Sequence, residues 1–90
     1  MKARIDRDAD AAYFEFSSVP AARQVVLDDG RILDFAEDGR LVGVEILSPS
    51  RGVHLEGVPR GEEIAAAARR LGLPVTGADG AASLREARSG

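Results

Sequence analysis

The sequence predicts an α+β protein: an antiparallel β-meander of about five strands with one C-terminal α-helix packed on the sheet. Two observations lead to this prediction. Asp-Gly pairs at residues 29–30 and 38–39 lie between apolar runs, and Asp-Gly readily supplies the positive φ angles of a tight hairpin turn. Helical patterning is confined to residues 62–71, so the strands precede the helix. We assign residues 1–75 to a single small domain, because 90 residues provide little more than one core.

A first hairpin precedes the meander. Residues 2–6 alternate polar and apolar side chains, and residues 12–17 alternate again, with Phe14 and Phe16 on one side. The Asp-rich segment between them is typical of a turn, because Asp side chains bond nearby backbone N–H groups. Pro20 follows the second strand, and proline cannot donate a hydrogen bond to a sheet.

Two-residue turns at both Asp-Gly pairs define the register of the meander over residues 25–47. Val26 then lies opposite Leu33, and Leu33 lies opposite Val44. The pleat gathers one wholly apolar face, which we predict to be the core: Val26, Leu33, Phe35, Val42, Val44 and Ile46. The other face is mixed and includes Asp34, Glu45 and four aliphatic side chains: Leu27, Ile32, Leu41 and Leu47.

The aliphatic side chains of the mixed face need a cover. The helix at 62–71, about 15 Å long, can cover one face of the sheet but not both. We therefore predict that Leu27, Ile32, Leu41 and Leu47 form the interface of a homodimer, with another protein as the alternative partner.

The helix at 62–71 carries its own start and stop signals. Acidic residues open it, arginines close it, and Gly72 ends it, in agreement with the helix dipole. Its apolar stripe consists of Ile64, Ala67, Ala68 and Leu71. Small and polar residues dominate 76–90, where we expect a mobile tail with a capping box at 83–86.

Composition argues against several classes of function. The net charge of −3 does not suit a protein that binds nucleic acid by neutralising phosphates. The chain has no cysteine, which removes disulfides and thiolate metal ligands. Its charged N-terminus and short apolar runs predict a cytoplasmic protein with no membrane partner. We expect no cofactor, because neither Gly-rich phosphate-binding motif occurs.

Asp6, Asp8 and Asp10 have the spacing that opens an EF-hand calcium loop. The positions that require glycine and glutamate are Ala11 and Ser17, and a strand follows instead of a helix. We therefore interpret the segment as a turn held by bonds from side chain to backbone, and we assign no metal ligand.

Asp34, Glu45 and His54 are the remaining candidates for chemistry. Asp34 and Glu45 are diagonal neighbours on one sheet face, about 7–8 Å apart at Cα, a spacing at which two carboxylates can share a metal or a water. We favour a structural role for both, in solvation or in ion pairs with arginines such as Arg23. His54 is the only histidine, and we favour an exposed or edge-strand position for it. No catalytic residue is assigned.

Two segments are similar to a widespread family of small bacterial domains of unknown function, number 2283. They are Met1-Lys2-x-x-Ile5-Asp6-x-Asp8-Ala9-Asp10-Ala11-x-Tyr13 and Ile32-Leu33-Asp34-Phe35-x-x-Asp38-Gly39-x-Leu41-Val42-Gly43-Val44-Glu45-Ile46-Leu47. The resemblance covers residues 2–50, and it departs mildly at Ile5 and Asp8. It implies a small β-rich fold and no established activity.

Three functions are consistent with the sequence. The first is a non-enzymatic module that self-associates or binds another protein, as two partly apolar sheet faces indicate. The alternative is an antitoxin-like regulatory partner, because an acidic chain suits a basic partner. The third is a small carboxylate-dependent enzyme that uses Asp34 and Glu45.

Overall fold

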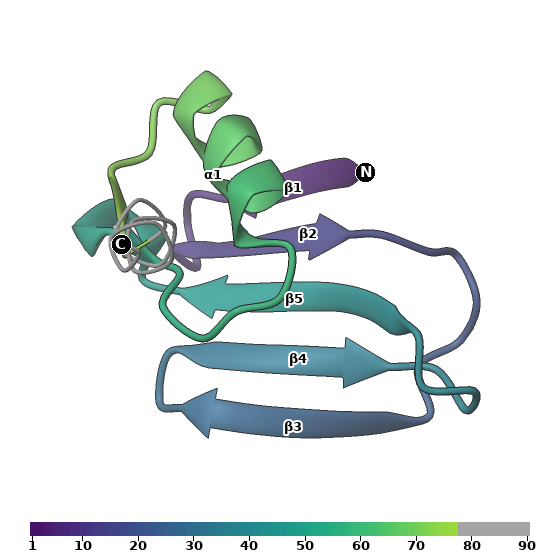
Figure 1. Ribbon diagram of the computed structural model, residues 1–90. Helices are drawn as coiled ribbons and strands as arrows, with labels where there is room; N and C mark the ends of the chain where they lie inside the picture. Colours follow the sequence, from purple (N-terminus) through teal and green to yellow (C-terminus); the bar gives the residue numbers. More distant parts are fainter. Residues whose placement is uncertain (78–90) are drawn as a thin grey trace, which may run out of the picture. The chain divides into compact units, whose positions relative to one another are not determined.

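The computed structural model describes residues 1–77, and these form two compact units: residues 1–49, and the chain from Ser50 onward (Figure 1). Residues 78–90, with the capping box predicted at 83–86, lie outside the described residues. The first unit contains five strands: β1 (Lys2–Asp6), β2 (Ala11–Glu15), β3 (Arg23–Asp28), β4 (Arg31–Phe35) and β5 (Leu41–Leu47). The second contains a 3-10 turn, η1 (Pro49–Arg51), which starts at the boundary, then β6 (Val53–His54), α1 (Gly61–Arg70) and β7 (Val75–Thr76).

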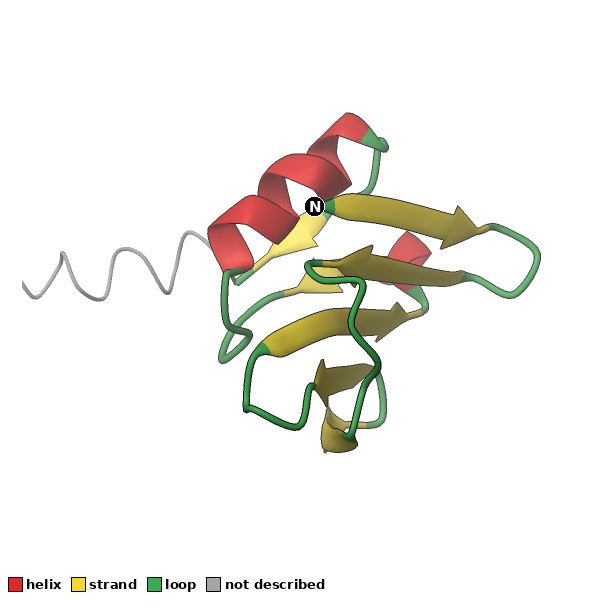
Figure 2. Cartoon of the chain, turned by 90° about the vertical axis from the view of Figure 1, so that its right-hand side faces the viewer, coloured by secondary structure: helices red, strands yellow, loops and turns green. Residues whose placement is uncertain are grey.

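The five strands of the first unit form one antiparallel sheet, in the order β1-β2-β5-β4-β3. The sheet, followed in the described part of the sequence by one α-helix, confirms the α+β class. The hairpin β1–β2 and the meander β3–β4–β5 are both confirmed. The whole sheet is not one continuous meander, because β2 pairs with β5. A loop over residues 16–22 runs along the end of the sheet and delivers the chain to β3 at the edge (Figure 2).

The predicted register is correct between β4 and β5 up to Asp34 and wrong between β3 and β4. Leu33 pairs with Val44 as predicted, but Leu33 pairs with Val25 and not with Val26. A bulge between Val26 and Asp28 is the reason, because it inserts Leu27 without a partner and shifts every pair beyond it. The shift moves Val26 out of the predicted core face, and its exposed fraction is 64%.

A second irregularity lies between β4 and β5. Asp34 pairs with Gly43, whereas Phe35 pairs with Leu41. Opposite residues share a face and neighbours along a strand alternate, so Leu41 lies on the side of Phe35 and not on the side of Asp34. With Leu27 in a bulge as well, the predicted common face of Leu27, Ile32, Leu41 and Leu47 is wrong. Their role in an interface stays a prediction.

The two Asp-Gly turns differ from one another. Gly39 has a φ of 91°, and the hydrogen bonds from the N–H of Ala36 to the O of Arg40 and from the N–H of Gly39 to the O of Ala36 close a three-residue loop. The two-residue turn predicted at Asp38–Gly39 is therefore wrong. At the first turn, Asp28 pairs with Arg31 as predicted, but Gly30 is not among the residues with positive φ. The carboxylate of Asp28 holds that turn, 3.0 Å from the N–H of Gly30.

The apolar face of the sheet is buried along its central strands. Phe14, Val44 and Ile46 are at most 1% exposed, and Leu33 and Val42 are at most 6% exposed. Phe35, also predicted in the core, is half-buried beneath the guanidinium of Arg23, which lies 5.3 Å from the ring centroid.

The second unit contains the predicted helix, displaced by one residue. Helix α1 spans Gly61–Arg70, and Gly72 follows with a φ of 78°, as a C-terminal glycine requires. Ile64, Ala67 and Ala68 of the predicted stripe are buried, together with Ala65, while Leu71 is half-buried. β6 and β7 pair in parallel in a separate small sheet.

Candidate functional site

A polar network crosses the second face of the sheet from β2 to β3. The Tyr13 hydroxyl donates to Asp34 Oδ2 at 2.9 Å, and Gln24 Nε2 donates to Asp34 Oδ1 at 2.9 Å. The register explains this arrangement, because Gln24, Asp34 and Gly43 are opposite one another on three adjacent strands. Both oxygens of Asp34 are therefore engaged by neutral donors.

Gly43 provides the space in which the network forms. A Cβ at this position would lie 2.1 Å from the Tyr13 hydroxyl and 2.3 Å from its Cζ. Only glycine lets the phenol cross β5 and reach Asp34 on β4, because any side chain would occupy the same volume.

Arg4 lies against the other side of the Tyr13 ring. Its guanidinium is 5.2 Å from the ring centroid, and its NH1 is 3.0 Å from Glu15 Oε1. Burial raises the pKa of Tyr13 from 10.0 to about 12, and the hydrogen bond to Asp34 acts in the same direction. The phenol therefore remains protonated at physiological pH and acts here as a hydrogen-bond donor.

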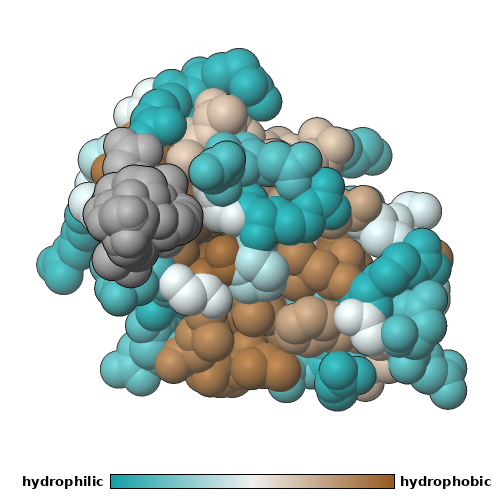
Figure 3. Space-filling model, in the orientation of Figure 1, coloured by the Kyte–Doolittle hydropathy of each residue, from teal (hydrophilic) through white to brown (hydrophobic). Residues whose placement is uncertain are grey.

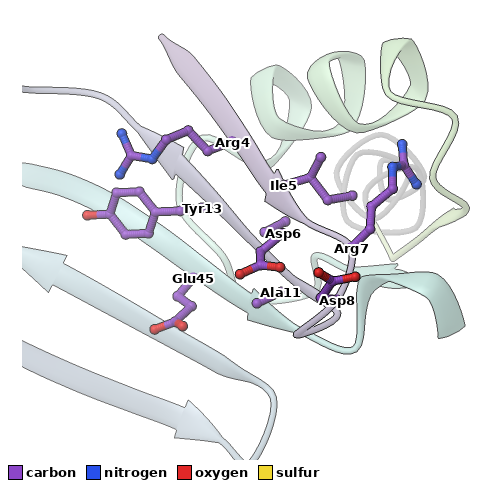
Figure 4. A pocket seen from close by; sticks show the side chains of 9 residues that line it. Arg4, Ile5, Asp6, Arg7, Asp8, Ala11, Tyr13 and Glu45 are labelled. Atoms are coloured by element: carbon purple, nitrogen blue, oxygen red, sulfur yellow. The ribbon is translucent and has the colours of Figure 1, made fainter.

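A shallow cavity of about 510 Å³ adjoins this network at the β1–β2 turn. Tyr13, Glu45 and Asp6 project toward it from three neighbouring strands (Figure 4). The remaining lining residues are Arg4, Ile5, Arg7, Asp8, Ala11 and Ala12. Its charged lining is mixed, with two arginines and three carboxylates, so it favours neither an anion nor a cation.

The predicted pair Asp34 and Glu45 does share a face, as diagonal neighbours. Asp34 lies opposite Gly43, and Glu45 lies opposite Ile32. Asp34 accepts hydrogen bonds from Tyr13 and Gln24, so its partners here are neutral side chains and not Arg23, which was one of the predicted alternatives. Arg23 instead stacks on Phe35. Within residues 1–77, no group of three or more His, Asp or Glu side chains is arranged to hold a metal ion.

The Asp-rich segment is a turn, as interpreted from the sequence. Asp6 Oδ1 accepts a hydrogen bond from the N–H of Ala9 at 3.0 Å, and Asp10 has a φ of 53°. His54 lies on the short strand β6, where its Nδ1 is 3.0 Å from Thr76 Oγ1 and its Nε2 is 3.7 Å from Glu56 Oε1. Its side chain is half exposed, in agreement with an edge-strand position.

The outer edge of the sheet at β3 is the most apolar exposed part of this unit. All six residues of β3 are exposed, and three consecutive ones are large and apolar. Their exposed fractions are 39% for Val25, 64% for Val26 and 37% for Leu27. Figure 3 shows hydrophobic side chains gathered in the lower part of the view, where Figure 1 places β3 and β4. This edge is the candidate interaction site.

Comparison with known proteins identifies the class to which this chain belongs. The family described as "Protein of unknown function (DUF2283)" matches residues 2–50, more than half of the chain, so the chain belongs to this family. The matched region coincides with the unit that carries the five-stranded sheet. No curated protein and no solved structure matches significantly. Among the described helices, none is long and apolar enough to cross a membrane.

Sequence reasoning missed the roles of Tyr13, Gln24 and Gly43. One signal was present: a glycine inside an otherwise apolar strand often marks a close approach by another group. The identity of that group could not be read from the pattern, because β2 and β5 are distant in sequence and their pairing was not predicted.

Proposed function

We propose that this protein is a non-enzymatic interaction module that self-associates as a homodimer. The observation that carries the proposal is the exposure of Val25, Val26 and Leu27 on an edge strand. Complete burial of one such side chain contributes about 1.5–3 kcal/mol, so water is an unfavourable environment for three in succession. A partner that covers this edge removes that cost.

The composition of the two sheet edges supports an interaction at β3. Natural edge strands carry charges that prevent another chain from pairing with them. β1, at one edge, has a charged residue at every second position: Lys2, Arg4 and Asp6. β3, at the other edge, has charges only at its ends, at Arg23 and Asp28. The edge with fewer charges is also the apolar one.

The state of the carboxylates supports a structural role over a catalytic one. Both oxygens of Asp34 accept hydrogen bonds from side chains of the same sheet, at 2.9 Å each. A carboxylate held in this way fixes the positions of the Tyr13 and Gln24 side chains, which come from two different strands of the same sheet.

Solution mass tests the proposal directly. We expect a dimer in sedimentation equilibrium at high micromolar concentration, and dissociation on dilution. Val26→Lys removes the most exposed apolar side chain of β3 and should weaken the dimer about tenfold or more, since a charge must then be buried or displaced. Its free energy of unfolding as a monomer should stay within about 0.5 kcal/mol of the wild type, because the site is exposed.

Leu47→Lys is the matched control, because it makes the same change at an exposed leucine on a central strand. If Leu47→Lys dissociates the dimer and Val26→Lys does not, the protein self-associates through the face of the sheet and not through β3. A wild-type chain that remains monomeric at high micromolar concentration contradicts the proposal.

A further inference from the structure

We infer that the partner at this edge is β3 of a second copy of the chain, paired antiparallel about a two-fold axis so that one sheet continues through both subunits. This inference rests on the proposed self-association and specifies its geometry.

The outer side of β3 presents backbone N–H and C=O groups that are not paired with another strand. Within the described chain β3 pairs with β4 alone, so alternate N–H and C=O groups along its outer side face away from any strand. A second strand satisfies these groups directly, whereas a helix or a loop does so only in part. The apolar centre of β3 adds side-chain contacts to the same pairing.

Symmetry restricts the register of this pairing. A two-fold axis that joins two edge strands into one antiparallel sheet is perpendicular to the sheet, so it pairs only residues that lie on the same face. A register centred on Val25 meets this condition. It places Val25 opposite Val25 of the partner subunit, and Gln24 opposite Val26 of the partner subunit.

Charge complementarity favours that register. β3 begins with Arg23 and ends with Asp28, and an antiparallel copy reverses this order. Arg23 then lies near the bulged, acidic end of the partner strand, which carries Asp28 of the partner subunit, and the same contact recurs across the axis. Cross-strand pairs of opposite charge stabilise sheets, whereas a parallel copy would bring like charges together.

Two features limit the pairing to a closed dimer. The bulge at Leu27 interrupts the strand near its end, so the regular segment is Arg23–Val26. The two-fold axis uses the same edge of both subunits, and the other edge of this five-stranded sheet is β1 with its alternating charges. Growth into a fibre therefore has no second apolar edge to use.

Engineered cysteines test the pairing, because the natural chain has none. In Val25→Cys the two cysteines face each other at the axis, with Cα atoms about 4.5–5.5 Å apart, within the range of about 4.4–6.8 Å that a disulfide allows. We expect this variant to form a covalent dimer under mild oxidation at least about tenfold faster than Lys2→Cys, an exposed position on the opposite edge strand.

A mixture of two variants tests the register. Gln24→Cys and Val26→Cys should each cross-link slowly when alone and rapidly when mixed, because each position faces the other across the axis. If the axis lies at Val26 instead, Val26→Cys should cross-link rapidly alone and the mixture slowly, and an axis at Gln24 gives the same result for Gln24→Cys. Either result contradicts a register centred on Val25. Gln24 and Val26 are both exposed, so the mixture also tests the pairing if Val25→Cys folds poorly.

The outcomes separate this inference from the proposed function. A dimeric wild type in which Val25→Cys cross-links no faster than Lys2→Cys overturns the edge pairing and leaves self-association in place. A monomeric wild type overturns both. Fast cross-linking in Val25→Cys, together with fast cross-linking only in the mixture, supports the pairing and its register.

Discussion

The hydroxyl of Tyr13 occupies the space that a side chain at position 43 would need, 2.1 Å from where a Cβ on Gly43 would stand. The two residues come from β2 and β5, which are adjacent in the sheet. Because position 43 has no side chain, the Tyr13 phenol can extend across β5 and donate a hydrogen bond to Asp34 on β4.

Gly43→Ala should destabilise the protein by about 1–3 kcal/mol, because the Tyr13 ring must leave its position and its hydrogen bond is lost. Urea titration measures the loss. In a Tyr13→Ala background the same substitution should cost much less, since the obstacle has been removed. Equal costs in both backgrounds would show that the phenol is not the reason for the glycine.

Tyr13→Phe should cost about 0.5–1.5 kcal/mol, because it deletes one donor to Asp34 and leaves the Gln24 bond. Asp34→Ala provides the control background, in which Tyr13→Phe should be nearly neutral. A double-mutant cycle on the free energy of unfolding gives the coupling. Coupling near zero would contradict the hydrogen bond as a source of stability.

The pH dependence of stability should include a loss in the alkaline range. Tyr13 has a pKa of about 12 in the folded protein against 10.0 ordinarily, so folding favours the protonated phenol. This contribution is complete below pH 10 and is lost as the pH rises to about 12. Ultraviolet titration can follow it, since Tyr13 is the only tyrosine. Asp34→Asn should lower this pKa, and an unchanged value would rule out the influence of the carboxylate.

The two turn glycines should differ in their tolerance of alanine. Gly39→Ala is expected to cost about 1 kcal/mol, because its φ of 91° is unfavourable for a residue with a Cβ. Gly30→Ala should be nearly neutral, since its φ is not positive and the nearest atom to a new Cβ is 3.8 Å away. Thermal unfolding of the two variants provides the comparison, and similar losses would contradict the difference in turn geometry.

The sequence was sufficient for the five strands of the first unit and for α1, but insufficient for β7 and for two details of strand pairing. Alternation located the strands, and the charge pattern located the helix to within a residue. The bulges at Leu27 and between β4 and β5 were not predictable, because one extra residue beside a turn leaves the apolar pattern unchanged while it reverses the faces beyond.

Two errors concealed the candidate edge: the register of β3 and the order of the strands. Val26 was assigned to the core through the wrong register, and β3 was not recognised as an edge because β2 was expected to precede it in space as well as in sequence. The diagonal placement of Asp34 and Glu45 was predicted correctly, since Asp34 lies before the irregularity of β4 and β5.

The central strand of the sheet is the last of the five to be synthesised. β1–β2 and β3–β4 are local hairpins, and each exposes one side until β5 enters between them. An isolated two-stranded hairpin is at best marginally stable in water, so a nascent chain that ends before Leu41 has no stable sheet. The five strands therefore become stable together once residues 41–47 are available to pair, and this sheet forms as one cooperative unit instead of hairpin by hairpin.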